Sequence, residues 1–343
     1  MKKWLTAIAL IGAASTLLAA DYANEVMAIG VGARALGMGG AFVALADDSS
    51  ATYWNAAGLP GINHFDFDFV QQGSGSLSSG LNMDQVDSEY MFLSGGMNLG
   101  NDLGAIGAGF LRYGVKDIPY VPVQTVNAGD APVTQGTFDT QDLGLMISYG
   151  RKITTGLNLG LGFKYLHGGT VNLPGGDATY TDYGLDLGVL VKFGEWTSNL
   201  KGLNLGLNIQ DLYNSGVTWE NTPTDPTDAV SPNVKLGIAY TPDFDFLKLS
   251  KSKWNLLVVD VDTKYSPVLL LHYGTEFWYK ETIGLRAGAR SFLGSNDNGG
   301  TSYQQGTEVS MGLSAHVLFL TVDYSYVNYE LTPMQYLNMG ITF

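Results

Sequence analysis

The sequence contains no cysteine and little charge, and both absences restrict what the protein can be. Without cysteine there is no disulfide framework, thiol nucleophile or lipid-attachment site. Charged residues make up 15% of the 343 residues, whereas an ordinary soluble domain has about 25%. The net charge of -14 comes without the clustered Lys and Arg that bind nucleic acid, so we expect no nucleic-acid partner.

Long apolar runs are also missing after residue 20. The best, 256–259 and 268–271, are far shorter than the roughly 20 residues that a spanning helix needs. Segments this short can cross lipid only as strands of a closed barrel, because a barrel satisfies every backbone polar group. The sequence therefore favours a membrane barrel over a helical membrane protein.

Catalytic and metal-binding motifs are absent as well. The histidines lie in separate segments, at His64, His167, His272 and His316, without the spacing of a His-Glu-x-x-His site. There is no Gly-x-Ser-x-Gly elbow. The stretches 225–228 and 296–300 depart from the spacing of a calcium loop, and we expect both in solvated outer loops. We predict that the protein is not an enzyme and has no catalytic, cofactor-binding or metal-binding residues; catalytic groups assembled across strands are the alternative.

Residues 1–20 have the layout of a cleaved export signal. Lys2 and Lys3 precede an apolar stretch, 4–18, and two small residues stand before the polar Asp21. A retained membrane helix is the alternative, but the apolar stretch is shorter than a spanning helix requires. We expect residues 1–20 to be removed on export.

The rest of the chain is rich in short stretches that alternate apolar and polar residues. Phe65, Phe67 and Phe69 alternate with polar neighbours, and the chain ends on the alternating segment 336–343. The other alternating stretches are 90–97, 104–115, 157–165, 185–193, 203–210, 234–240, 254–265, 283–291, 309–313 and 318–326. Period two gives each strand one apolar and one polar face. We predict an all-β fold over residues 62–343, a transmembrane antiparallel β-barrel of about fourteen strands; a soluble β-sandwich or propeller is the alternative.

The connections between these strands alternate in length. The expected inner turns are 98–103, 150–156, 194–201, 241–253, 280–281 and 315–316. The expected outer loops are 72–88, 116–140, 168–182, 211–232, 264–267, 293–305 and 328–333. Short periplasmic turns and longer extracellular loops are typical of outer-membrane barrels. We therefore expect the protein in the outer membrane of a Gram-negative-type bacterium, in contact with lipid and lipopolysaccharide.

Residues 21–61 differ from the barrel, because they are rich in small residues and lack strand alternation. The pair Gly30-x-Gly32 has no preceding strand, no third glycine in register and no Gly-Lys-Ser/Thr, so nucleotide binding is disfavoured. Small residues allow close packing, and a barrel of this size has a lumen wide enough to hold a plug. We predict that residues 21–61 form a hatch of short helices and turns inside the barrel.

The runs 32–48 and 54–59 closely resemble the N-terminal motif of the PorV/PorQ and UPF0164 outer-membrane proteins, relatives of the FadL/TodX transporters. Ala56 stands where that family usually has proline, which leaves the backbone after Asn55 freer. The resemblance implies a fourteen-stranded barrel with an N-terminal hatch. It implies passive uptake of hydrophobic small molecules such as long-chain fatty acids or, as in the PorV branch, a component of a type IX protein secretion system that works with secretion-machine proteins.

The candidate site residues follow from the resemblance and from the charges. We expect Trp54 and Asn55 to anchor the hatch to the wall, Asp47 and Asp48 to cap or pair nearby, and Arg34 to find an acidic lumen partner such as Asp186 or Asp260. The FadL branch releases ligands sideways at a kinked third strand, so Gly104, Gly107 and Gly109 are candidates for a lateral gap. The polar faces also carry charges of both signs, which we expect to pair with each other or with the hatch: Lys164, Asp186, Lys192, Lys235, Asp260, Asp262, Glu276, Arg286, Arg290 and Asp323.

Overall fold

The computed structural model describes residues 25–73, 87–100, 103–121, 134–222, 224–242, 252–264, 268–293, 306–329 and 333–343. The expected export signal lies outside these residues, as do parts of the expected outer loops. Within the described ranges, no helix is long and apolar enough to cross a membrane.

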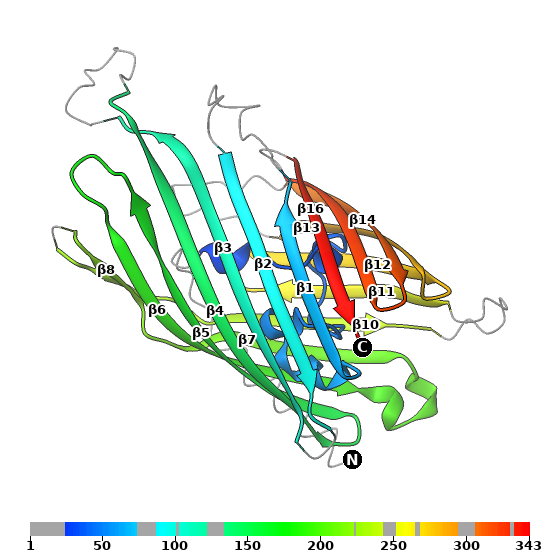
Figure 1. Cartoon of the computed structure of the whole chain (residues 1–343). Coiled ribbons are helices and arrows are strands. Elements are labelled where there is room, and N and C mark those ends of the chain that lie inside the picture. The colour runs from blue at the N-terminus through cyan, green and yellow to red at the C-terminus, as the bar shows by residue number, and fades with distance from the viewer. Residues whose placement is uncertain are drawn as a thin grey trace.

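Fourteen antiparallel strands of the described chain close into a barrel, as the alternation predicts (Figure 1). They are β1 (Phe65–Gln72), β2 (Asp87–Asn98), β3 (Ala105–Pro119), β4 (Thr137–Thr154), β5 (Leu157–Val171), β6 (Thr179–Lys192), β7 (Leu203–Asn214), β10 (Asn233–Tyr240), β11 (Lys253–Asp262), β12 (Leu269–Tyr279), β13 (Ile283–Leu293), β14 (Thr307–Val317), β15 (Leu320–Asn328) and β16 (Pro333–Thr342). The first strand pairs with the last, which removes the open edges. A short hairpin, β8 (Val217–Glu220) with β9 (Thr227–Asp228), extends the sheet beside β6.

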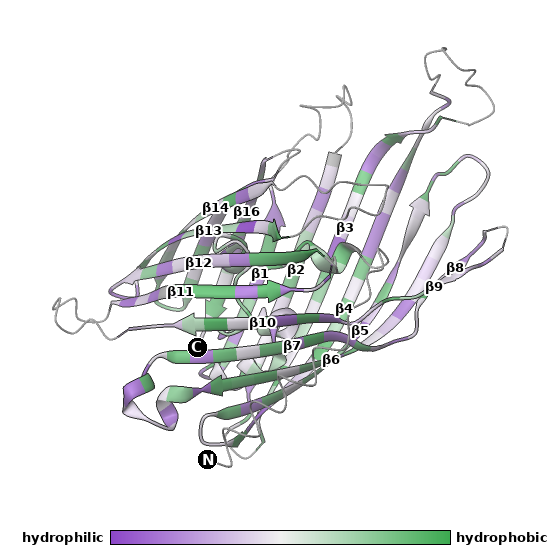
Figure 2. Cartoon of the chain, turned by 180° about the vertical axis from the view of Figure 1, so that it is seen from behind, coloured by the Kyte–Doolittle hydropathy of each residue, from purple (hydrophilic) through white to green (hydrophobic). Residues whose placement is uncertain are grey.

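The two faces of the wall differ in chemistry, and the alternation sets which residues face which way. On β5, Leu161 and Phe163 face outward and are 60% and 44% exposed, whereas Lys164 faces inward and is buried. Figure 2 shows hydrophobic and hydrophilic residues alternating along the strands. An apolar outer face with a polar inner face is the arrangement that lipid requires.

One end of the barrel carries tight turns. The first residues of β1 and the last residues of β16, the two strands that close the barrel, lie at the same end. The turn between β12 and β13 has three residues, 280–282; Lys280 and Glu281 both have positive φ, and the Thr282 N–H donates to the Tyr279 carbonyl. At the same end the carbonyl of Phe343 accepts hydrogen bonds from the N–H groups of His64 and Phe65. Because tight turns are periplasmic in outer-membrane barrels, we take this end as periplasmic and the opposite end as the outer end.

Two of the predicted turns were misplaced. The turn expected at 315–316 lies at 318–319, because β14 continues to Val317 and Leu318 adopts φ 61°. The turn expected at 150–156 is reduced to 155–156, because β4 keeps pairing with β5 as far as Thr154. In both places the ladder of backbone hydrogen bonds extends the strand beyond its apolar alternation.

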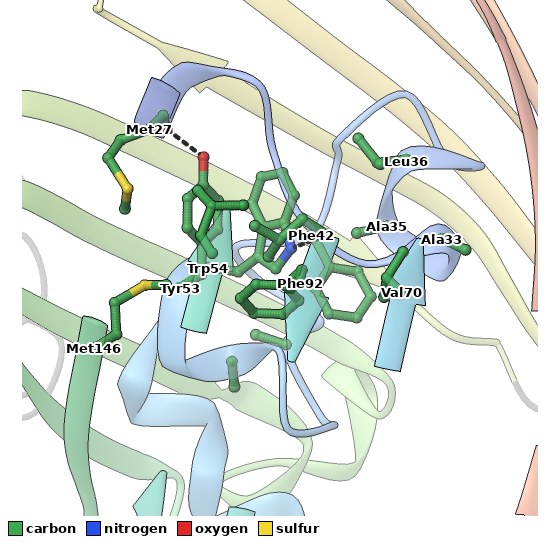
Figure 3. Close-up of a cluster of buried hydrophobic side chains, with 14 of the residues drawn as sticks. Met27, Ala33, Ala35, Leu36, Phe42, Tyr53, Trp54, Val70, Phe92 and Met146 are labelled. Carbon is green, nitrogen blue, oxygen red and sulfur yellow. Dashed lines mark hydrogen bonds between the residues drawn. The ribbon is translucent and has the colours of Figure 1, made fainter. Parts of the chain in front are cut away.

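Residues 25–64, called the luminal segment below, lie inside the barrel (Figure 1). They contain η2 (Glu25–Ala28), α2 (Ala33–Leu36), α3 (Ala51–Trp54) and η3 (Ala56–Gly61). Their side chains join inward-facing wall residues in one hydrophobic cluster, in which Phe42, Tyr53 and Trp54 lie near Phe92 of β2 (Figure 3). The core of the protein is therefore the packing of this segment against the wall.

Candidate functional site

Inward-facing glycines let the luminal segment rest on the backbone of the wall. We call these residues the glycine belt: Gly107, Gly150, Gly160, Gly188, Gly206, Gly274 and Gly288. A Cβ on Gly160 would lie 2.2 Å from the Ala57 nitrogen, and one on Gly288 would lie 2.1 Å from the Met38 carbonyl carbon. Real Cβ atoms do not approach backbone so closely, so only glycine fits at these two positions; at Gly107 and Gly188 the nearest atoms belong to the side chains of Thr52 and Asn55. The belt spans seven strands, from β3 to β7 and on β12 and β13, and seats the segment across the lumen.

Asn55 connects the luminal segment to the wall, as its position in the motif predicts. Its Nδ2 donates to the Val189 carbonyl of β6 at 3.1 Å and to the Val43 carbonyl at 2.9 Å. Its Oδ1 accepts from the Ala57 N–H at 3.1 Å and so caps η3, although Ala56 replaces the proline of the motif. The side chain is fully buried, so each of these bonds replaces water.

The side chain of Trp54 makes its hydrogen bond and its closest ring contact within the luminal segment. Its Nε1 donates to the Val31 carbonyl at 3.0 Å, and its ring packs edge-on against Tyr53. The contact with the wall is made by Lys235 of β10, whose Nζ lies 5.3 Å from the indole centroid and 5.5 Å from the Tyr53 ring. Trp54 therefore meets the wall through a cation over its face and not through a hydrogen bond.

Arg34 sits at the centre of a charged network. Its guanidinium contacts Asp47 at 2.6 Å and Asp48 at 2.9 Å within the segment. On the wall side it makes a bidentate pair with Glu276 of β12, both bonds at 2.8 Å. Glu276 also accepts from Arg286 of β13 at 2.6 Å, so the segment and the wall share one carboxylate.

The acidic lumen partner expected for Arg34 is therefore Glu276, and the two examples named for it, Asp186 and Asp260, were wrong. Asp260 instead accepts the backbone N–H groups of Phe42 and Val43, at 2.5 and 2.8 Å, and Asp186 pairs with Lys164 at 3.0 Å. The cause is the rotational setting of α2, which has only four residues and turns Arg34 toward β12.

Burial and neighbouring charges shift the pKa values of the ionisable groups in the luminal segment. Burial disfavours the charged form of Arg34, but Asp47, Glu276 and Asp48 outweigh it and raise the pKa of the guanidinium well above its usual value. Burial also opposes ionisation of Asp47, yet Arg34 and Lys253 keep its pKa below the usual value. Burial raises the pKa of Asp48 to about 6; Arg34 opposes this shift, and the carboxylates of Asp66 and Asp47 add to it.

The outer and inner halves of the lumen, on either side of the luminal segment, differ in their large apolar side chains. Large apolar and aromatic side chains that face inward gather in the outer half: Val70, Tyr90, Leu111, Tyr113, Leu166, Tyr180, Val217, Trp219, Val327, Tyr329, Met334 and Tyr336. We call these residues the vestibule. The inner half presents polar groups: Asp66, Asp68, Ser94, Ser148, Asn158, Asn208, Asn255, Glu276, Arg286, Ser314, Asp323 and Asn338. The apolar side chains of the vestibule are buried or half-buried against the luminal segment, and the outer half also holds charged pairs such as Lys235 with Asp262, so the two halves differ in apolar and aromatic content and not in the presence of charge.

A cavity lies on each side of the luminal segment. The inner one, of about 230 Å³, is lined by Arg34, Asp47, Asp48 and further carboxylates of the wall, including Asp68. The outer one, of about 20 Å³, lies beside the vestibule and has a mixed lining. Its residues are Ala28, Ile29, Gly30, Leu36, Gly39, Gly40, Trp54, Lys235, Asp262, His272, Arg290, Glu308, Ser310, Val327 and Tyr329. We call this space the outer cavity.

The wall is continuous at the glycines of β3. Gly107 lies opposite Gly96 of β2 and Ser148 of β4, and Gly109 is likewise paired on both sides. Gly104, just before β3, has φ 79° and lies against the Gly150 carbonyl. These glycines accommodate the luminal segment and the neighbouring chain, and β3 has its irregularity further along, between Val115 and Ile118.

An interruption of the ladder that the alternation did not reveal lies between β6 and β7. There the stretch 210–212 of β7 stands opposite the single residue Asp186, and Asp211 has φ 56°. The Lys164 ammonium bridges Asp186 at 3.0 Å and Asp211 at 2.9 Å on the lumen side, and the Lys164 side chain is 1% exposed. A buried ion pair therefore holds the wall together where backbone hydrogen bonds are missing.

The sequence pattern predicted most of the lumen charges but not which of them pair. It did not predict the vestibule or the glycine belt. The sequence does contain a signal for the glycine belt, since its glycines fall in register with the polar face of each strand. The vestibule had one too, because tyrosines occupy inward positions that are polar elsewhere. Among the described residues no three His, Cys, Asp or Glu side chains gather as a metal site; that the protein is not an enzyme stays a prediction.

A closed antiparallel barrel with an apolar exterior, tight turns at one end and a filled lumen defines an outer-membrane β-barrel of a Gram-negative bacterium. Known barrels of this shape share the fold. The Pseudomonas putida toluene transporter TodX has a TM-score of 0.55 and 14% identity, over 91% of this chain and 96% of that chain. The Ralstonia pickettii toluene transporter TbuX has a TM-score of 0.56 and 12% identity, over 91% and 97%. A Pseudomonas aeruginosa FadL homologue has a TM-score of 0.50 and 10% identity, over 88% and 95%.

No family model matches the sequence, and no curated protein matches it. The PorV/PorQ and UPF0164 resemblance of residues 32–59 is therefore not confirmed by a family match. The likeness to the solved barrels establishes the fold alone.

Proposed function

We propose that the protein is a passive channel through which hydrophobic small molecules enter across the outer membrane. The observation that carries the proposal is the asymmetry of the lumen, whose outer half gathers the large apolar and aromatic side chains of the vestibule around the luminal segment. Concave sites lined by apolar and aromatic side chains with a few polar groups are typical of small-molecule binding. The solved barrels named as toluene transporters share the fold, which supports the same class of cargo here.

The charged and polar contacts of the luminal segment assign it a gating role in this proposal. Asn55 and Arg34 hold the segment against the wall through Val189 and Glu276, whereas Trp54, Asp47 and Asp48 brace the segment internally. Passage requires part of this packing to change, because the segment rests on the glycine belt. The cargo then leaves below the segment or through the wall; an exit beside Gly104, Gly107 and Gly109 would require the paired ladder of β3 to open.

Uptake of radiolabelled toluene and dodecane by cells that produce the barrel tests the proposal. Ile29→Asn places an amide among the apolar side chains that pack on the luminal segment, and we expect it to reduce uptake several-fold, because a polar side chain there disfavours passage of an apolar molecule. Leu318→Asn is the matched control: Leu318 is 86% exposed in a periplasmic turn with φ 61°, a conformation that asparagine tolerates. Equal uptake by cells with and without a correctly folded barrel would refute the channel.

The alternative, a PorV-type component of a type IX secretion system, rests on the resemblance of residues 32–59. It requires no ligand in the vestibule. Failure of the folded barrel to bind or transport any apolar probe would favour it, and co-purification with secretion-machine proteins is the direct test.

A further inference from the structure

One row of inward-facing residues crosses the outer half of the lumen on neighbouring strands. Tyr113 of β3 lies opposite Asp142 of β4, and Asp142 lies opposite Gly168 of β5. Tyr90 of β2 continues the row beyond Tyr113, and Tyr180 of β6 continues it beyond Gly168. With Trp219 of β8, which lies opposite Tyr180, these residues form what we call the vestibule row: Tyr90, Tyr113, Asp142, Gly168, Tyr180 and Trp219.

Asp142 is the charged member of the vestibule row, and its carboxylate is only partly engaged. The Tyr180 hydroxyl donates to its Oδ1 at 2.6 Å. Within the described ranges of the chain, no cationic side chain pairs with Asp142. A carboxylate among aromatic side chains is costly unless a positive charge approaches it, so the row is prepared for a cation from outside the chain.

The cations elsewhere in the outer half and on β3 are held by other carboxylates. They are Lys235 with Asp262, Arg290 with Glu308, and Arg112 and Lys116 with Glu89. The counter-charge of Asp142 is therefore not supplied by these side chains.

Aromatic rings stand on both sides of the Asp142 carboxylate. Tyr113 is its direct partner across the β3–β4 ladder, where Cβ atoms are about 5 Å apart. On the other side the Tyr180 ring lies 5.2 Å from the Trp219 ring, measured between centroids. Gly168 leaves room for this arrangement, because a Cβ there would lie 2.2 Å from Asp142 Oδ1 and 2.8 Å from Tyr180 Cε1.

The vestibule row stays accessible from the lumen. Tyr113, Asp142 and Trp219 are half-buried, so part of each side chain remains exposed. Tyr90 is buried, and its hydroxyl donates to the Gly30 carbonyl of the luminal segment at 3.1 Å. The row thus borders the outer side of the luminal segment, where a molecule that enters from outside would reach it.

We propose that the vestibule row binds hydrophobic molecules that carry an ammonium group. The Asp142 carboxylate supplies the counter-charge, and the neighbouring Tyr and Trp rings attract the cation through their faces while they cover the apolar part of the ligand. A ligand carboxylate would instead meet a like charge. The inference rests on the proposed channel function and adds cationic amines to its cargo.

Three ligands of similar size and different charge test this preference: 2-phenylethylamine, propylbenzene and 3-phenylpropanoate. At pH 7.5 the amine is cationic and the acid is anionic, since their usual pKa values are about 10 and about 4. By equilibrium dialysis with the detergent-purified barrel, corrected for uptake by detergent micelles, we expect the amine to bind at least about ten times more tightly than the acid. Asp142→Asn should weaken binding of the amine about tenfold and leave propylbenzene unchanged, because the amide keeps the shape and loses the charge.

Asp139→Asn is the matched control, because it removes the same charge from the same strand. Asp139 lies three residues before Asp142, so its side chain is on the opposite face of β4. Its carboxylate accepts the Asp117 N–H at 2.9 Å, which an amide oxygen can also accept. This variant should bind all three ligands as the wild type does.

The variants are compared only after heat-modifiable migration shows a folded barrel. If the wild type binds the acid as tightly as the amine, or if Asp139→Asn weakens amine binding as much as Asp142→Asn does, the inference is overturned and the channel stands. If the folded wild type binds none of the three ligands, the proposed channel itself fails.

Discussion

Substituting one belt glycine should unseat the luminal segment without disturbing the barrel. In Gly160→Ala the new Cβ would lie 2.2 Å from the Ala57 nitrogen and 2.4 Å from the Ala56 carbonyl carbon. Ordinary contact begins at 3.4 Å, so η3 must move away from β5 by about 1.2 Å. Overpacking of this kind costs about 1–3 kcal/mol, which would raise the population of the unseated segment roughly 5- to 150-fold.

The chain offers a control on the same strand and the same face. A Cβ on Gly162, two residues further along β5, would lie 3.4 Å from its nearest neighbours, Asp186 and Ser148, which is ordinary contact. Gly162→Ala should therefore leave the segment seated. The two variants differ only in whether the added methyl group meets the luminal segment.

Cysteine labelling measures the difference, because the protein has no cysteine of its own. Ser49→Cys places a thiol on the luminal segment at a fully buried site with little change in size. Its reaction rate with a maleimide follows the population of the open segment when opening is fast relative to labelling. The rate should rise at least fivefold with Gly160→Ala and stay unchanged with Gly162→Ala. Equal rates in the two variants would refute the claim that the belt seats the segment.

The remaining predictions concern pH and the wall. Burial raises the pKa of Asp48 to about 6, so the protonated form of this carboxyl is favoured when the segment is seated. The seated state should therefore be most stable below the unperturbed pKa of 3.8 and should lose stability as the pH rises through 6. Hydrogen exchange of residues 49–59, corrected for intrinsic rates between pH 4 and 7.5, should show this trend and lose it in Asp48→Asn; an equal trend in the variant would contradict the assignment. A disulfide between Leu93→Cys and Phe110→Cys, which locks the paired β2–β3 ladder, should leave toluene uptake unchanged. A disulfide between Leu185→Cys and Tyr213→Cys, beside the interrupted β6–β7 ladder, tests the weaker part of the wall. If uptake falls only with the disulfide between β2 and β3, the exit lies beside the β3 glycines.

The alternation of side chains predicted the strands because a membrane wall imposes it on every strand. Leu161 and Phe163 must face lipid, so the residues between them must face inward, whatever the rest of the chain does. The same argument listed Glu276 and Arg286 as lumen charges. It could not show that Arg34 meets Glu276, since the two are 242 residues apart and the contact depends on how α2 is seated. Turns such as 318–319 were missed by two or three residues because a ladder continues through residues that no longer alternate clearly.

The glycines of the wall and the small residues of the luminal segment belong to one packing solution. Gly150 and Gly160 lie opposite each other on β4 and β5, and both meet Ala56 of the segment. A side chain at either place would separate segment and wall, and an open gap would let polar solutes pass between the two halves of the lumen. In the proposed channel, direct backbone contact instead makes entry of cargo depend on the state of the segment. The acidic cavity beneath Arg34 then gives the segment a charged inner face, so an apolar molecule that displaces it from above also disturbs ion pairs below. In the proposed channel, opening is for this reason coupled to the electrostatics of the periplasmic side.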